Sequence, residues 1–144
     1  MTNKKCVLPE NAFKVSKKGY EEYHVPAPEA KSMDPSEKLV PINSLPSWAQ
    51  PAFAGFNNLN RIQSRLVTVA LEDDQNVLLC APTGAGKTNV ALLTMLHEIG
   101  KYVKSEITTT SAIPVALDEF KIVYIAPMKA LVQEMVRNFS TRLQ

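Results

Sequence analysis

The chain has few of the features that mark extracellular or membrane proteins. Only two cysteines, Cys6 and Cys80, occur in 144 residues, and their wide separation indicates neither a disulfide framework nor a metal site. No apolar run is long enough to span a bilayer, and the N-terminus lacks the apolar stretch of a secretory signal. The net charge of +2 is too small to indicate any partner. We therefore expect a protein of the cytosol or nucleus with no membrane partner.

Glycine is also scarce, but two of the five glycines lie in one stretch, residues 81 to 88, Ala-Pro-Thr-Gly-Ala-Gly-Lys-Thr. This stretch nearly matches G-x-x-x-x-G-K-[ST], a loop whose backbone N–H groups surround nucleotide phosphates. In that pattern Gly84 and Gly86 let the backbone close around the anion, Lys87 reaches the terminal phosphates, and the Thr88 hydroxyl ligates Mg²⁺. The first position departs from the pattern, because alanine stands in place of glycine.

The neighbours of this loop have the required character, since its mechanism needs a strand before it and a helix after it. Residues 76 to 80 form a short apolar run, typical of a strand buried on both faces of a parallel sheet. Residues 88 to 99 have the length of a helix and are apolar nearly all round, with Gly100 as its C-terminal stop. Such a helix points its N-terminal dipole at the phosphates. The alternative, an incidental glycine-rich turn, is disfavoured by this context.

The first 50 residues differ in composition from the rest of the chain. Seven of the 10 prolines lie at or before Pro51, among scattered lysines. That composition resists regular packing, so we predict an extended, partly disordered lead-in over residues 1 to 50, with short strand character at residues 20 to 25. A solvated tail is favoured over an RNA-binding role for its lysines, because no aromatic pattern or dense basic run accompanies them.

From residue 51 to residue 144 the pattern is that of an α/β domain. Apolar residues at helical spacing lie on one face before the loop, at Leu59, Ile62, Leu66, Val69 and Ala70. Residues 101 to 120 are predicted as a long loop, residues 121 to 126 as a second buried strand, and residues 130 to 143 as a helix. The two strands are expected to pair in a parallel sheet through a right-handed crossover.

Gln63 lies 24 residues before Lys87 and has two interpretations. A glutamine amide donates to and accepts from one base edge at once, which suits the recognition of adenine. Alternatively, Asn60 is the N-cap of a helix and Gln63 is its capping-box partner, which is a purely local role. The residues alone favour neither interpretation.

Residues 127 to 131 follow the second predicted strand and begin the last predicted helix. Ligands of open α/β sheets bind at such carboxyl ends of strands, and a helix start with a lysine can hold a phosphate of a nucleic acid. The alternative is an ordinary turn followed by a core stripe of Leu131, Met135 and Phe139. The two are compatible, because the stripe packs inward while the helix start faces a ligand.

Three motifs in this order resemble those of the superfamily-two DExH helicases. Residues 56 to 63 resemble the Q-type motif, residues 81 to 88 motif I, and residues 126 to 134 motif Ia. Motif I of that superfamily commonly opens with alanine, so the departure from the general pattern supports the resemblance. Further segments, including residues 19 to 26 and 45 to 50, resemble the first helicase cassette of the spliceosomal DExH RNA helicases. The helicase of the activating signal cointegrator complex shares most of these motifs.

The resemblance implies a P-loop NTPase with an incomplete RecA-like parallel sheet, flanking helices and an extended N-terminal lead-in. It implies an ATP-dependent RNA helicase of pre-mRNA splicing, located in the nucleus, with ATP and Mg²⁺ as cofactors and small nuclear RNA and spliceosomal proteins as partners. The implied nucleotide-binding residues are Gln63, Ala81, Pro82, Thr83, Gly84, Ala85, Gly86, Lys87 and Thr88, with Lys87 and Thr88 also catalytic and Thr88 the Mg²⁺ ligand. The implied RNA contacts are Pro127, Met128, Lys129, Ala130 and Leu131.

Some parts that a helicase motor requires do not occur in these 144 residues. Hydrolysis needs a carboxylate pair for Mg²⁺ and the attacking water, and arginines from a second RecA-like domain. No D-E-x-H string is present, and Asp118-Glu119 lies before the second predicted strand, which is the wrong place. We therefore expect a fragment of a larger protein, with weak or no ATPase activity alone. A non-catalytic nucleotide-binding or interaction module is the alternative, whereas a GTPase is disfavoured because no N-K-x-D string occurs.

Overall fold

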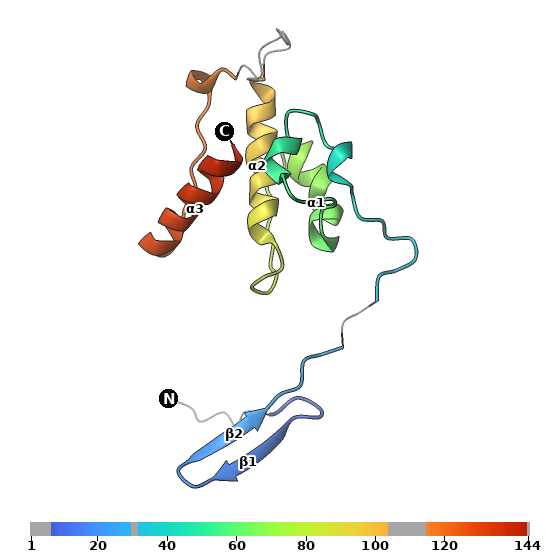
Figure 1. Ribbon diagram of the computed structural model, residues 1–144, viewed down its shortest axis with the longest axis vertical. Helices are drawn as coiled ribbons and strands as arrows, with labels where there is room; N and C mark the ends of the chain where they lie inside the picture. Colours follow the sequence, from blue (N-terminus) through green and yellow to red (C-terminus); the bar gives the residue numbers. More distant parts are fainter. Residues whose placement is uncertain (1–6, 30–31, 104–114, 144) are drawn as a thin grey trace. The chain divides into compact units, whose positions relative to one another are not determined.

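The computed structural model describes residues 7 to 29, 32 to 103 and 115 to 143 (Figure 1). The chain divides into two units, Met1–Pro35 and Ser36–Gln144, which are described separately. The lead-in predicted for residues 1 to 50 and the loop predicted for residues 101 to 120 lie partly outside the described ranges. Within those ranges no helix is both long and apolar enough to cross a membrane.

The first unit contains an antiparallel hairpin of β1 (Phe13–Lys17) and β2 (Tyr20–His24). Gly19, with a φ of 98°, supplies the left-handed conformation that the tight turn between them requires. The strand character predicted for residues 20 to 25 is confirmed as β2, whereas β1 was not predicted. Cross-strand pairs hold the register, including a salt bridge of 2.6 Å between Lys14 and Glu21.

The described residues of the second unit form three α-helices and three short 3₁₀ helices. All three predicted α-helices are confirmed, as α1 (Arg61–Leu71), α2 (Lys87–Lys101) and α3 (Lys129–Arg142). The 3₁₀ helices are η1 (Ile42–Ser44), η2 (Gln50–Phe53) and η3 (Leu117–Glu119). Figure 1 shows α2 between α1 and α3, with α1 packed directly against it.

The core of this unit surrounds α2. Leu92 and Leu93 are fully buried, which explains why this helix is apolar nearly all round. Further buried side chains come from α1, from the turn before it, from α2 and from the segment that contains η1 and η2: Ile42, Leu45, Ala49, Ala52, Phe53, Leu59, Ala70, Leu71, Val90, Met95 and Leu96. Residues 36 to 50, which the sequence placed in the lead-in, thus contribute part of the core.

Gly100 does not end α2, so the predicted C-terminal stop is wrong. The helix continues to Lys101, and the indole ring of Trp48 lies against the glycine. A Cβ at this position would stand 2.5 Å from the Trp48 ring, so the glycine permits close packing of a ring on a helix. A glycine is required at this position, but the reason is a tertiary contact with Trp48 rather than a helix cap.

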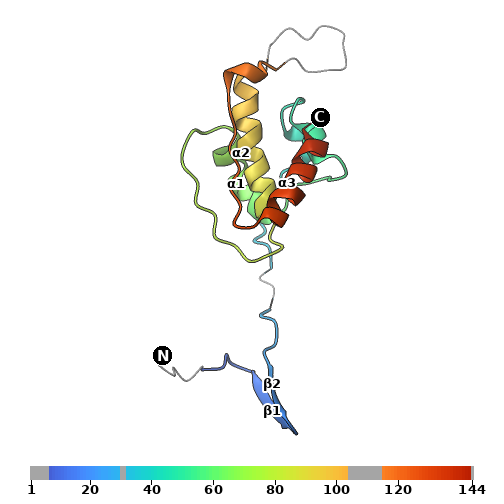
Figure 2. The same cartoon turned by 90° about the vertical axis from the view of Figure 1, so that its left-hand side faces the viewer.

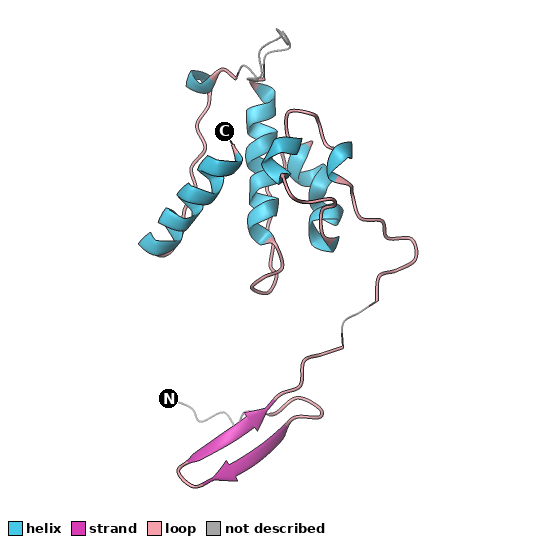
Figure 3. Cartoon of the chain, viewed as in Figure 1, coloured by secondary structure: helices cyan, strands magenta, loops and turns pink. Residues whose placement is uncertain are grey.

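The predicted parallel sheet is absent from the described residues, where the only sheet is the hairpin. Residues 76 to 80 and 121 to 126 run as extended chain without ladder hydrogen bonds and appear as loop in Figure 3. Figure 2 shows residues 121 to 126 descending beside α2 from η3 to α3. The prediction that these two strands pair in parallel is therefore wrong for this structure.

Side-chain exposure in these segments gives the physical reason. Val77 and Leu79 are half-buried while Leu78 between them is 90% exposed, and Ile125 in the second segment is 88% exposed. Each segment thus buries only part of its apolar surface, so the prediction of burial on both faces is also wrong. Parallel strands are stable only with ladder partners and with cover on both faces, and two strands alone are marginal. Cys80, placed in a core strand by the sequence, is accordingly exposed.

His97 fastens α2 to the end of α1. Its Nδ1 lies 2.7 Å from the carbonyl oxygen of Leu71, and its Nε2 lies 2.9 Å from Oδ1 of Asp74, which also pairs with Lys101. Because both ring nitrogens face acceptors, only the protonated imidazolium donates to both. The hydrogen bonds to Asp74 and then to Leu71 raise the pKa of His97. Lys101 and His97 in turn lower the pKa of Asp74 to about 2.

This contact predicts a pH-dependent contribution of His97 to stability. A histidine whose pKa is raised by folding stabilises the native state below its unfolded pKa of about 6.5, and the contribution disappears as the pH rises through the folded pKa. We expect His97→Gln to lower the midpoint of urea unfolding more at pH 5.5 than at pH 9. Asp74→Asn, which removes the carboxylate partner, is expected to reduce the same pH dependence. An equal loss at both pH values would contradict the assignment.

Candidate nucleotide site

The candidate loop lies at the lower end of α2 in Figure 1, between the extended segment of residues 76 to 80 and the first turn of the helix. Gly84 has a φ of 82°, and Gly86, the N-cap of α2, has a φ of 86°. Both values lie in the left-handed region that side chains disfavour. The two glycines therefore make the reversal of the chain into α2 sterically feasible.

Gly86 is also required for space. A Cβ at this position would overlap Nε2 of Gln63 and stand 2.7 Å from Nδ2 of Asn60. The start of α1 thus reaches the backbone of the loop directly, without an intervening side chain. Substitution at Gly86 would displace both polar side chains as well as strain the backbone.

Asn60 and Gln63 form the capping box that the sequence offered as one interpretation of Gln63. The backbone N–H of Gln63 donates to Oδ1 of Asn60 at 2.9 Å, and the backbone N–H of Asn60 donates to Oε1 of Gln63 at 3.0 Å. The remaining amide groups bind the loop: Nε2 of Gln63 donates to the Gly86 carbonyl at 3.2 Å, and Nδ2 of Asn60 donates to the Ala85 carbonyl at 3.0 Å. The local role is confirmed, and the recognition of adenine stays a prediction.

Lys87 is folded back over the loop. Its ammonium group donates to the carbonyl oxygens of Ala81 at 2.7 Å and Pro82 at 2.8 Å. Thr88 follows it in the first turn of α2, where unpaired N–H groups and the helix dipole favour an anion. The loop therefore gathers a cation, a hydroxyl and helix-start amides within one turn. This donor set fits the phosphates of a nucleotide and an accompanying Mg²⁺ ion.

The candidate nucleic-acid segment lies at the start of α3. Met128 is the N-cap residue of this helix, has no capping hydrogen bond from its side chain and is 59% exposed. Pro127, Lys129 and Ala130 are also exposed, whereas Leu131 is half-buried. Of the inward stripe predicted for α3, Leu131, Met135 and Phe139 are all half-buried, and Phe139 packs against the core. The helix start thus presents amide groups and one lysine to solvent, as an anion-binding segment requires.

The sequence did not indicate the hydrogen bond from Asn60 at the start of α1 to the Ala85 carbonyl of the loop. Asn60 was considered only as an N-cap, but its Nδ2 also holds the Ala85 carbonyl 25 residues away. No local pattern indicates such a contact, because the cap geometry uses only the side-chain oxygen. The proximity of Asn60 to Gln63 in the sequence was the only available signal.

The extended segment, the glycine loop and the following helix have the order of the phosphate-binding loop in the P-loop NTPase class. The family model for the DEAD/DEAH box helicases matches residues 60 to 144, and the chain belongs to this family. The family implies a RecA-like fold, of which this structure shows the helices and the loop. The resemblance to superfamily-two helicases drawn from three short motifs is thereby confirmed.

Curated relatives extend the likeness over almost the whole chain. The chain is 59% identical over 143 residues to the U5 small nuclear ribonucleoprotein 200 kDa helicase of Caenorhabditis elegans and 55% identical to that of Homo sapiens. It is 53% identical over 143 residues to the pre-mRNA-splicing factor brr2 of Schizosaccharomyces pombe. Each match covers 99% of this chain but 6% of the relative. The likeness to spliceosomal helicases that the sequence indicated is confirmed.

Two substitutions at Asn60 separate the cap from the contact with the loop. Asn60→Ala removes both, and we expect it to lower the free energy of unfolding by about 1 kcal/mol, as for the loss of an N-cap. Asn60→Asp keeps the capping oxygen but has no donor for the Ala85 carbonyl. It should therefore retain most of the stability while amide hydrogen exchange in residues 84 to 88 accelerates. Equal stability losses in urea unfolding for the two variants would contradict this division.

Proposed function

We propose that this chain is the ATP-binding first part of an RNA helicase that acts in nuclear pre-mRNA splicing. The observation that carries the proposal is the glycine loop at the start of α2, held by Asn60 and Gln63, in a chain of the DEAD/DEAH box helicase family. The names of its relatives, a U5 small nuclear ribonucleoprotein helicase and a splicing factor, support the choice of RNA and spliceosomal proteins as partners.

Binding of ATP would use the loop as follows. Backbone amides of residues 84 to 88 and the positive end of the α2 dipole hold the phosphates, with Pro82, Thr83 and Ala85 completing the loop. The ammonium group of Lys87 exchanges the Ala81 and Pro82 carbonyls for phosphate oxygens. The Thr88 hydroxyl ligates Mg²⁺, which neutralises charge on the phosphates when it is bound.

Gln63 would supply the preference for adenine. Its side chain is only 4% exposed, so its amide is fixed in orientation by the capping box and the Gly86 carbonyl. The hydrogen bonds described above use one lone pair of Oε1 and one N–H of Nε2, and each atom has a second. A fixed amide with one donor and one acceptor remaining suits the edge of adenine, which offers both.

The proposal predicts that Lys87→Ala weakens the binding of Mg²⁺-ATP at least tenfold, because a charge-assisted hydrogen bond is worth about 1.5–3 kcal/mol. Isothermal titration calorimetry on the 144-residue chain measures the affinity. Lys121→Ala, which removes a charge from the exposed lysine at the start of the second extended segment, is the matched control and should bind ATP like the wild type. Equal affinities of the wild type and Lys87→Ala would refute the assignment of the loop.

The proposed RNA contact at the start of α3 predicts a change in salt dependence. Lys129→Ala removes one phosphate contact and should therefore weaken the binding of single-stranded RNA. A plot of the logarithm of the binding constant against the logarithm of the salt concentration should also become less steep, by about 0.7. Fluorescence anisotropy with one labelled oligonucleotide at several salt concentrations measures both quantities. Lys121→Ala is again the control. An unchanged slope in Lys129→Ala would show that this lysine does not contact an RNA phosphate.

A further inference from the structure

Arg142, the last residue of α3, reaches from its own helix to two other elements. Its Nε donates to the carbonyl of Ala52 in η2 at 2.7 Å, and its Nη1 donates to Oδ1 of Asn89 on α2 at 2.7 Å. The guanidinium plane also covers two aromatic rings, with its central carbon 5.1 Å from the centre of Phe53 and 5.9 Å from that of Phe56. Segments 53 and 90 residues away in the sequence are thus joined by one side chain.

Asn89 connects this contact to the phosphate loop. It is the residue directly after Thr88 in the first turn of α2, and its backbone N–H donates to the Gly86 carbonyl at 3.1 Å. That carbonyl is the same one that Gln63 holds from α1. The first turn of α2 is therefore fixed from two sides, by Gln63 through the loop and by Arg142 through the Asn89 side chain.

The arrangement is costly for a residue that only stabilises the fold. Burial lowers the pKa of Arg142, and its Nη2 is buried without a hydrogen-bond partner in the described part of the chain. An apolar side chain would cover Phe53 and Phe56 without desolvating a charge, and such replacements of buried ions are often neutral or stabilising. An apolar residue cannot supply the planar guanidinium group, whose N–H donors hold the Asn89 side chain and the Ala52 carbonyl at the same time.

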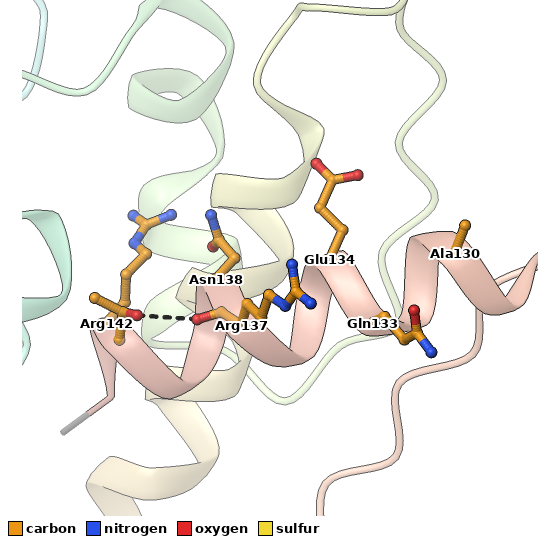
Figure 4. Close-up of a pocket in the computed structure, with 7 residues that line it drawn as sticks. Ala130, Gln133, Glu134, Arg137, Asn138 and Arg142 are labelled. Carbon is orange, nitrogen blue, oxygen red and sulfur yellow. Dashed lines mark hydrogen bonds between the residues drawn. The ribbon is translucent and has the colours of Figure 1, made fainter.

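Helix α3 depends on few other contacts. It has no fully buried residue, and its apolar stripe reaches the core through Phe139, which packs edge-on against Tyr124. Figure 4 shows Arg142 at the end of the helix and Arg137 earlier on it, both lining a groove along α3. Arg137 is exposed, so a substitution of this arginine on the same helix serves as a matched control for a substitution of Arg142.

We propose that Arg142 is a positioning residue of the nucleotide site, which acts through Asn89 to hold the first turn of α2, with Lys87 and Thr88, in fixed register against η2 and α3. This inference rests on the proposed ATP-binding function. Arg142 does not touch the nucleotide in this scheme. It fixes the geometry of the groups that do, as a supporting shell does for a preorganised site.

The test compares Arg142→Lys, Asn89→Ala and the double variant in the 144-residue chain, with Arg137→Lys as control. Lysine keeps the charge but has one nitrogen, so it cannot serve Ala52 and Asn89 in one plane. We expect each single variant to bind Mg²⁺-ATP about tenfold more weakly, as for loss of a hydrogen bond to a charged group, and the double variant to bind no more weakly than either. Arg137→Lys should match the wild type.

A rescue distinguishes positioning from general stability. Arg142→Lys combined with Asn89→Asp pairs an ammonium group with a carboxylate, and should regain most of the affinity for ATP that Arg142→Lys loses. Thermal unfolding of every variant is measured in parallel. Additive losses in the double variant, or unchanged ATP affinity in Asn89→Ala, would overturn the proposal, because Arg142 would then act on η2 alone.

Hydrogen exchange separates the failure of this inference from the failure of the proposed function. If the wild type binds no ATP, or if Lys87→Ala binds it equally well, the assignment of the loop as a nucleotide site is wrong. In that case the rates of amide hydrogen exchange in residues 84 to 91 test whether Arg142 holds the first turn of α2. Faster exchange there in both Arg142→Lys and Asn89→Ala, with none in Arg137→Lys, supports it. Unchanged exchange in Asn89→Ala, which is the variant expected to disturb the core least, overturns it.

Discussion

The contact on which the rest of the site depends is the approach of the α1 start to the backbone of Gly86. Two side-chain amides, those of Asn60 and Gln63, cap α1 with their oxygens and hold the loop carbonyls with their nitrogens. Each amide thus satisfies a helix end with its oxygen and a loop carbonyl with its nitrogen at the same time, which a carboxylate cannot do because it has no hydrogen-bond donor. The left-handed glycine is what allows the two elements to meet.

This double use removes the conflict between the two interpretations of Gln63. A purely local capping role would leave its Nε2 free to face solvent, but the atom points to the loop and the side chain is almost fully buried. A role in reading a base requires an amide that does not rotate, and the capping box provides that restraint. The local role is therefore a condition for the proposed recognition of adenine rather than a competitor to it.

Sequence patterns predicted the features that depend on neighbours within a few residues. The helices of the second unit and the glycine conformation of the loop follow from spacings of three or four residues or from a short motif, and the capping box is one of the two roles that the spacing of Asn60 and Gln63 offered. The predictions failed where distant segments decide the outcome. Gly100 looks like a helix stop until Trp48 is placed beside it, and residues 121 to 126 have strand composition but no strand beside them in the described residues.

In the candidate site, too, the local features were predictable from the sequence and the long-range contacts were not. The phosphate loop was recognisable because its chemistry lies in eight consecutive residues, whereas the contact of Arg142 with Asn89 spans 53 residues and has no local signature. A guanidinium at the end of one helix looks like an ordinary C-terminal cation that complements the helix dipole. Only the fold shows that it turns away from its own helix to the start of another.

The position of Lys87 sets how strongly the loop can bind a triphosphate. Its ammonium group already has two carbonyl partners, so binding exchanges these hydrogen bonds for bonds to phosphate instead of pairing an unsatisfied cation. Both sets of hydrogen bonds are charge-assisted because the ammonium group is ionised, so the gain in free energy is the extra attraction of the cation to an anionic phosphate oxygen over a neutral carbonyl oxygen. The carbonyls of Ala81 and Pro82 thus keep the lysine beside the loop without removing its preference for an anion. A loop that holds its cation in this way is preorganised for the ligand, because little side-chain entropy remains to be lost on binding.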